Sequence, residues 1–119
     1  MARIRLKDSW LAPTDLEAAK DALELFFKRT KMQVVEQDRD EWRVKQGSQL
    51  RLRLFGGWFI SPESLPKRAT IVLRSEEDGV LVKAVIEDTL GFGILDPLLE
   101  SKYEDYCDQW LDRLRRAIR

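Results

Sequence analysis

The sequence contains no histidine and a single cysteine, Cys107. Without histidine there is no Ser-His-Asp or Cys-His catalytic pair, no histidine general base and no zinc site that combines cysteine with histidine. A single cysteine cannot form a disulfide within the chain, which agrees with a reducing compartment. The common hydrolase and zinc mechanisms are therefore excluded, and no motif in the sequence indicates a cofactor or a metal. We expect a non-enzymatic domain.

An excess of charge and long hydrophobic runs are also missing. The 21 basic and 21 acidic residues cancel, so no global field attracts nucleic acid or an anionic membrane. No stretch approaches the roughly 18 uninterrupted apolar residues of a membrane span, and none reads as a signal peptide. We therefore expect a cytoplasmic protein. With 44% hydrophobic and 35% charged residues, the composition predicts one folded domain over residues 1–119.

Hydrophobic periodicity predicts an α+β fold: an antiparallel sheet of five to six strands, with an N-terminal helix and a long C-terminal helix packed on one face. Strands are expected over residues 3–6, 32–37, 41–45, 49–54, 69–75 and 80–87. Thr14 and Glu17 are spaced as a capping box, which predicts a helix ending near Arg29.

The last helix is predicted to begin at Pro97, with Asp96 as its N-cap, and to extend to about residue 118. Its apolar residues recur at helical spacing and form one stripe, made of Leu99, Tyr103, Tyr106, Cys107, Trp110, Leu114 and Ala117. Because Cys107 lies on this stripe, we expect its thiol to pack as a small hydrophobe with a raised pKa.

Two other possible reaction centres are weak. Glu87 and Asp88 are adjacent, and adjacent residues on a strand point to opposite faces, so they cannot flank one substrate unless the strand has ended before them. The glycines around Phe92 lack the third glycine and the acidic residue of a dinucleotide-binding motif. Neither pattern predicts catalysis.

Two neighbouring predicted strands share a local patch of positive charge. Period-two alternation places its members on one face of two adjacent strands: Arg43, Lys45, Arg51 and Arg53. Such a face can take an RNA backbone or another anion, but no aromatic residue alternates with these side chains to stack on bases. We expect a solvated outer face rather than a nucleic-acid site.

The second hairpin, over residues 69–87, is apolar on both faces. A single layer of helices covers one face only, so the other needs a loop, a ligand or a partner. There are three alternatives for the apolar loops around Trp58, Phe59 and Phe92: they fold back over this second face, they line a small-molecule cavity, or they form a homodimer contact. The sequence leaves these three alternatives open.

The order of elements, with Lys45-x-Gly47-Ser48-x-Leu50 in the middle hairpin, resembles small bacterial α+β domains of unassigned function. In outline it is also similar to helix-grip ligand-binding proteins of the START and polyketide-cyclase type. That resemblance implies an apolar cavity between the sheet and the helix over residues 98–118.

Self-association through the apolar surface of the second hairpin and the apolar loops is the first hypothesis from the sequence. The second is an apolar-ligand module that uses Trp58, Phe59, Phe92 and Trp110. The third is an anionic-polymer binder that uses the basic sheet face.

Overall fold

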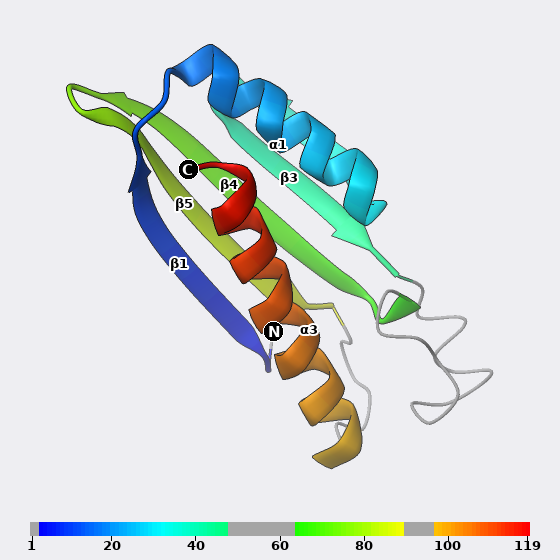
Figure 1. The fold of residues 1–119 in the computed structure, drawn as a ribbon. Helices are drawn as coiled ribbons and strands as arrows, with labels where there is room; N and C mark the ends of the chain where they lie inside the picture. Colours follow the sequence, from blue (N-terminus) through cyan, green and yellow to red (C-terminus); the bar gives the residue numbers. More distant parts are fainter. Residues whose placement is uncertain (1–2, 48–63, 90–96) are drawn as a thin grey trace.

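The structure is a computed structural model, and it describes residues 3–47, 64–89 and 97–119. Five strands and two helices lie in this part of the chain (Figure 1). In chain order they are β1 (Arg5–Ala12), α1 (Leu16–Thr30), β2 (Gln33–Asp38), β3 (Glu41–Gln46), β4 (Lys67–Glu76), β5 (Gly79–Asp88) and α3 (Pro97–Ala117).

The strands form one antiparallel sheet in the order β1-β5-β4-β3-β2. Both helices lie on the same face of this sheet, which we call the inner face (Figure 1). The predicted α+β class, with a helix before the sheet and a long helix after it, is therefore confirmed. The strand expected over residues 49–54 lies outside the described residues.

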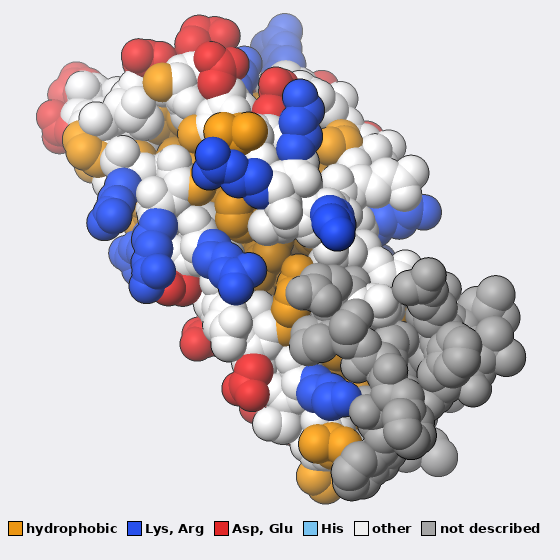
Figure 2. Space-filling model, turned by 45° about the vertical axis from the view of Figure 1, so that its right-hand side comes forward, with side chains coloured by type: hydrophobic (Ala, Val, Ile, Leu, Met, Phe, Trp, Pro, Cys, Tyr) orange, Lys and Arg blue, Asp and Glu red, His pale blue; other side chains and the backbone are white. Residues whose placement is uncertain are grey.

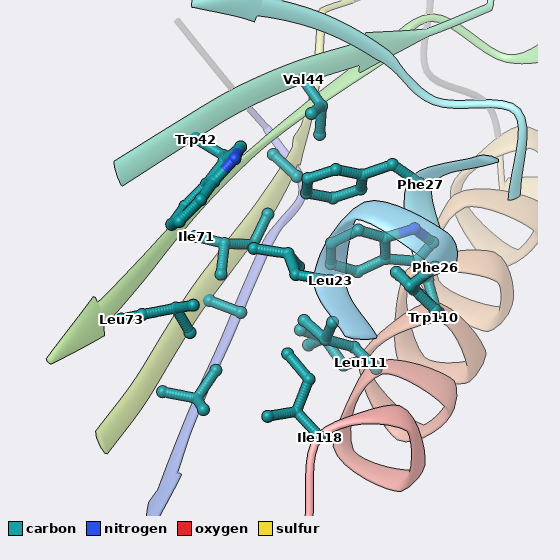
Figure 3. Close-up of a cluster of buried hydrophobic side chains, with 14 of the residues drawn as sticks. Leu23, Phe26, Phe27, Trp42, Val44, Ile71, Leu73, Trp110, Leu111 and Ile118 are labelled. Carbon is teal, nitrogen blue, oxygen red and sulfur yellow. The ribbon is translucent and has the colours of Figure 1, made fainter. Parts of the chain in front are cut away.

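The core fills the space between the inner face and the two helices (Figure 3). Leu23, Phe26 and Phe27 of α1 share this core with Trp110 of α3, and the Phe26 and Trp110 rings contact edge to face with their centroids 5.3 Å apart. Strands β4 and β5 place every second residue in this core: Ala69, Ile71, Leu73, Val80, Val82, Ala84 and Ile86, each at most 2% exposed. Alternation along the central strands thus specifies which face is buried.

The first strand is longer than the sequence suggested. It begins at Arg5 rather than residue 3 and continues to Ala12, because it pairs with β5 along its whole length. Trp10 and Ala12 enter the core from this strand, and the Trp10 indole N–H donates to the carbonyl of Ile118 at 2.7 Å. This hydrogen bond connects the residue after the C-terminal helix to the first strand.

The capping prediction for α1 was wrong by one residue. Asp15, in extended conformation, is the N-cap, and its carboxylate accepts the Ala18 N–H at 2.8 Å. Thr14 instead donates its backbone N–H to the carbonyl of Ala12. Asp and Thr both cap helices well, so the pattern identified the helix start without choosing between the two neighbours.

Helix α3 begins at Pro97 as predicted, and most of its apolar stripe is buried. Ala117 is exposed instead, while Leu111 and Ile118 enter the core. None of the helices in the described ranges is both long enough and apolar enough to cross a membrane.

The β4–β5 turn depends on Gly79, whose φ of 147° is rarely adopted by residues with side chains. A Cβ at this position would lie 2.1 Å from the carbonyl oxygen of Ala12. Glycine therefore allows the end of β1 to approach the start of β5, which is what the β1–β5 pairing requires.

Candidate ligand site beneath the C-terminal helix

A row of three polar residues crosses the inner face at one end of the sheet. Gln46 of β3 is the register partner of Lys67 on β4, and Lys67 is the partner of Asp88 on β5. One step further along the same face, the corresponding row is entirely apolar and buried: Val44, Ala69 and Ile86. The inner face thus changes from apolar to polar in its last row, which we call the polar row.

Lys67 is the most unusual member of the polar row, because its side chain is 0% exposed. Its ammonium donates to the carbonyl of Leu65 at 2.7 Å and to the Gln46 amide oxygen at 3.3 Å. The same ammonium lies 4.2 Å from the centre of the Tyr106 ring, a cation–π contact. Burying a charge is costly unless it is well hydrogen-bonded, and this one is held from three sides.

Asp88 carries the opposite charge and is only 2% exposed. One carboxylate oxygen accepts two backbone N–H groups, from Arg3 at 2.7 Å and from Ile4 at 2.8 Å. Hydrogen bonds to a charged carboxylate are among the strong ones in proteins. The carboxylate therefore joins the start of the first strand to the end of the last one.

Gln46 links the polar row to both helices. Its amide N–H donates to the carbonyl of Thr30, at the end of α1, at 2.6 Å. Its amide oxygen accepts the hydroxyl of Tyr106 on α3 at 2.7 Å, in addition to Lys67. The position of this amide is thus determined by two helices and a neighbouring strand.

Two apolar clusters lie beside the polar row. The large core cluster is on one side, and a smaller cluster of Ile4, Leu65, Leu99 and Tyr103 is separate from it. Tyr103 is 0% exposed and donates its hydroxyl to the carbonyl of Pro66 at 2.8 Å. Polar groups are thereby placed between two apolar regions beneath α3.

Burial dominates the protonation of two α3 side chains near this site. It raises the pKa of the Cys107 thiol to about 12, with Lys67 opposing the shift and Asp88 adding to it. Burial, followed by the charge of Asp88, also raises the pKa of the Tyr103 phenol above its usual range. The expected packing of Cys107 is confirmed, since its side chain is 0% exposed, and at neutral pH the buried thiol is a weak nucleophile.

The arrangement offers hydrogen bonds rather than a reaction centre. An ammonium, an amide and a phenol converge beside apolar surface, the combination that orients small molecules in protein pockets. Figure 2 shows hydrophobic side chains reaching the surface in a narrow strip between Lys and Arg side chains. Within the described residues there is no group of three or more cysteine and acidic side chains that could hold a metal ion.

Of the ligand residues predicted from the sequence, the described ranges include only Trp110. It is 2% exposed in the core, and its indole N–H has no hydrogen-bond partner within those ranges. Trp58, Phe59 and Phe92 lie outside the described residues. The segments that contain them adjoin Gly47 and Thr89, which follow the polar-row residues Gln46 and Asp88 in the chain.

Of the predicted anion-binding residues, Arg43 and Lys45 are exposed on the face opposite the helices, and Arg51 and Arg53 lie outside the described residues. Arg43 forms ion pairs with Glu36 at 3.1 Å and with Glu41 at 3.2 Å. The sheet therefore brings acids from β2 and β3 to a patch that contains none between residues 42 and 53 of the sequence. Anion binding here stays a prediction.

The polar row itself was missed by sequence reasoning. The strands were expected over residues 69–75 and 80–87, which leaves out Lys67 and Asp88, because charged residues at strand ends usually meet solvent. The signal was nevertheless present, since both continue the inward alternation of Ala69 and of Ile86. What the sequence could not supply was the register that aligns them with Gln46.

The order of the strands, with the first beside the last, and the long terminal helix across one face define a helix-grip-like α+β fold. Among solved structures, the chain is similar to TTHA0849 from Thermus thermophilus, with a TM-score of 0.52 and 11% identity over 96% of this chain and 93% of that one. It is also similar to Ara h 8.0201, with a TM-score of 0.48 and 11% identity over 93% and 94%. At such low identity, the likeness to TTHA0849 concerns the fold alone.

Comparison with models of protein families finds no match, and comparison with curated protein sequences finds none either.

Proposed function

We propose that the protein is a helix-grip domain that binds a small, largely apolar molecule beneath α3, with the polar row holding its one polar group. The observation that carries this proposal is the row of Gln46, Lys67 and Asp88, next to the apolar and buried row of Val44, Ala69 and Ile86 on the inner face. A domain that needed only stability would gain as much from apolar residues there, since buried ion pairs seldom stabilise more than well-packed hydrophobic side chains do.

The charges in the polar row favour a neutral ligand. Lys67 and Asp88 contribute one formal charge of each sign to the row. An anionic ligand would add an unmatched negative charge beside Asp88 in a buried site, which is costly. A hydroxyl or carbonyl group adds no charge and can exchange hydrogen bonds with Gln46, Tyr106 and Lys67.

Calorimetric titration with two probes of the same apolar body tests this proposal. 2-Naphthol is neutral and carries a hydroxyl, whereas 2-naphthoate carries a carboxylate. We expect saturable binding of 2-naphthol and weaker binding of 2-naphthoate. Tyr106→Phe removes one hydroxyl of the site and keeps the ring over Lys67, so it should weaken 2-naphthol binding about fivefold, the value of one hydrogen bond.

The matched control is Thr70→Val, which also removes one hydroxyl from a half-buried position but lies on the opposite face of the sheet. It should leave 2-naphthol binding unchanged. No saturable heat with either probe, or equal affinity in wild type and Tyr106→Phe, would contradict the proposal and leave the polar row with a purely structural role.

A further inference from the structure

The face of the sheet opposite the helices, which we call the outer face, has no described element packed on it (Figure 1). The strand register arranges its side chains in rows that run from β1 to β2. The row at the same end of the sheet as the polar row reads Arg5, Glu87, Arg68, Lys45 and Gln33. The next row reads Lys7, Val85, Thr70, Arg43 and Glu36. Together these two rows carry five basic and two acidic side chains.

Positive charge is concentrated in these two rows, which we call the basic end of the outer face. The third row has one basic and two acidic side chains, and it reads Ser9, Lys83, Val72, Glu41 and Asp38. The chain as a whole has equal numbers of basic and acidic residues, so the excess at the basic end is local.

A groove of about 660 Å³ lies at the basic end. Its lining includes three basic side chains and one hydroxyl of the outer face, together with two acids: Arg43, Lys45, Arg68, Thr70, Glu36 and Glu87. The volume is within the range of protein sites for small molecules, about 300–1,000 Å³. A cleft in which one sign of charge predominates raises the local concentration of ligands of the opposite sign. The groove therefore favours a small anion.

The register places four hydrogen-bond donors close together in this groove. Lys45 is the partner of Arg68, and Arg43 is the partner of Thr70. Neighbouring strands are about 4.8 Å apart, and alternate residues of one strand are about 7 Å apart, so the four Cα atoms mark the corners of a small rectangle. Thr70 is half-buried, whereas the three basic side chains are exposed. An anion above this rectangle is within reach of three long basic side chains and the Thr70 hydroxyl.

All three basic side chains keep nitrogen atoms for a ligand. Lys45 forms no ion pair within the described part of the chain. Arg68 joins Nε to the carboxylate of Glu87 at 2.6 Å, so its Nη atoms can donate to a ligand. Arg43 uses its Nη atoms for two acids of β2 and β3, so its Nε can do the same. These ion pairs hold both guanidinium groups beside the groove.

We propose that this groove binds the phosphate group of a small phosphomonoester. Such a group carries nearly two negative charges at neutral pH and has three acceptor oxygens. It therefore matches three basic side chains and a hydroxyl better than a carboxylate does, which has one charge and two oxygens. The inference does not rest on the proposed function, because the ligand site beneath α3 is on the other face of the sheet.

Acidic side chains around the four donors favour a single phosphate group over a nucleic acid. Glu36 flanks the donors on the β2 side, and Glu87 flanks them on the β5 side. Toward the third row, β3 carries Glu41. The neighbouring phosphates of a polymer laid in these directions would meet carboxylates. The two rows of the basic end also contain no aromatic side chain on which a base could stack.

Titration of isotope-labelled protein with phenyl phosphate at low salt, followed by amide chemical shifts in NMR spectra, tests this proposal. We expect saturable shifts at Arg43, Lys45 and Thr70, with a sub-millimolar dissociation constant that rises as salt is added. Phenyl sulfate has nearly the same shape but only one negative charge, so it should bind at least about fivefold more weakly.

Lys45→Gln removes one charged donor and should weaken phenyl phosphate binding about tenfold, whereas Lys45→Arg should keep the affinity within about threefold of wild type. The matched control is Lys83→Gln, the same substitution at an exposed lysine of the third row, outside the groove. It should leave phenyl phosphate binding unchanged. Tyr106→Phe, in the ligand site on the other face, should leave it unchanged as well, so the two sites are tested separately.

The absence of saturable shifts at Thr70 would overturn the phosphate site. Equal losses of affinity in Lys45→Gln and Lys83→Gln would also overturn it, because they would indicate a general effect of charge rather than a contact in the groove. A single-stranded RNA oligonucleotide that binds more tightly than phenyl phosphate at the same salt concentration would overturn the assignment to a small phosphomonoester.

Discussion

Ile71 and Val72 are neighbours on the same strand, yet they belong to different environments. Ile71 is 0% exposed beneath the helices, whereas Val72 is half-buried on the outer face. On β3, β4 and β5 the inner face is mostly apolar up to the polar row, whereas the outer face carries charged residues around a small apolar centre. The comparison shows that burial by the helices selects apolar residues on one face, while the other face can carry charged residues.

Among the inner-face substitutions, Lys67→Met is expected to cause the largest loss in the free energy of unfolding. Without its ammonium, the buried carboxylate of Asp88 loses the positive charge of its register partner. Its loss also deprives the buried carbonyl of Leu65 and the amide oxygen of Gln46 of this donor, and each buried polar group that loses its partner costs about 1–3 kcal/mol. Urea unfolding should show this decrease in the free energy of unfolding. Lys83→Met, on the outer face of β5, is the control and should change it by about 0.5 kcal/mol or less. Equal losses of unfolding free energy in Lys67→Met and Lys83→Met would mean that the polar row is no more sensitive to substitution than an exposed lysine is.

Ile71→Ala is expected to cause the next largest loss in the free energy of unfolding. Its side chain is fully buried among core residues, and removing it loses apolar burial and leaves a cavity, at a cost of about 2–5 kcal/mol. The midpoint of urea unfolding should fall with an unchanged slope. A loss below about 1 kcal/mol would indicate that the core around β4 relaxes far more than a packed interior normally does.

Alkaline pH distinguishes the buried thiol and phenol from exposed groups. The pKa of Cys107 is raised from 9.0 to about 12, so the folded protein keeps this proton at a pH where the unfolded chain releases it. The resulting stabilisation is complete below about pH 9 and is lost as pH rises toward 12. The raised pKa of Tyr103 acts in the same direction.

We therefore expect the free energy of unfolding to fall above pH 9 by at most about 1.4 kcal/mol per pH unit for each group. Urea melts between pH 8 and 11, near the ordinary pKa values of the two groups, measure this slope. Cys107→Ala and Tyr103→Phe should each make it shallower. A slope that neither substitution changes would assign the alkaline loss of stability to other groups.

The smallest expected effect is that of Val72→Ala on the free energy of unfolding in dilute protein, about 0.5 kcal/mol or less. It makes a matched pair with Ile71→Ala, one residue away on the opposite face. A cost near that of Ile71→Ala would show that the side chain of Val72 is buried within a single chain.

Helices and strands were predictable from the sequence where one hydrophobic period dominates. Pro97 marked the start of α3, and the alternation of β4 and β5 sorted their residues into two faces without indicating which face the helices cover. Choices between near-equivalent neighbours were not predictable, as with Thr14 and Asp15 as caps. The same applies at the end of α3, where Ala117 was predicted to lie on the apolar stripe. Ala117 is exposed, and its neighbour Ile118 is buried instead.

The candidate site was less predictable than the fold. Gln46, Lys67 and Asp88 are distant in sequence and meet only through the register of three strands. A sequence gives the alternation that turns each of them inward, but not the pairing that aligns them. The same limit applies to the outer face, where the positive patch predicted around Arg43 acquires its acidic partners from β2 and β3.

The bonds from Arg3 and Ile4 to Asp88 join residues 85 and 84 positions apart, and this separation has a consequence for folding. The two hairpins, β2–β3 and β4–β5, can form from local contacts, whereas β1 has no strand to pair with until β5 exists. Loop closure over such a distance slows folding. During synthesis, the N-terminal strand must wait, with Trp10 still unburied, until nearly the whole chain has emerged. Of the five described strands, β1 therefore precedes the others in the sequence but can pair only after β5 has formed.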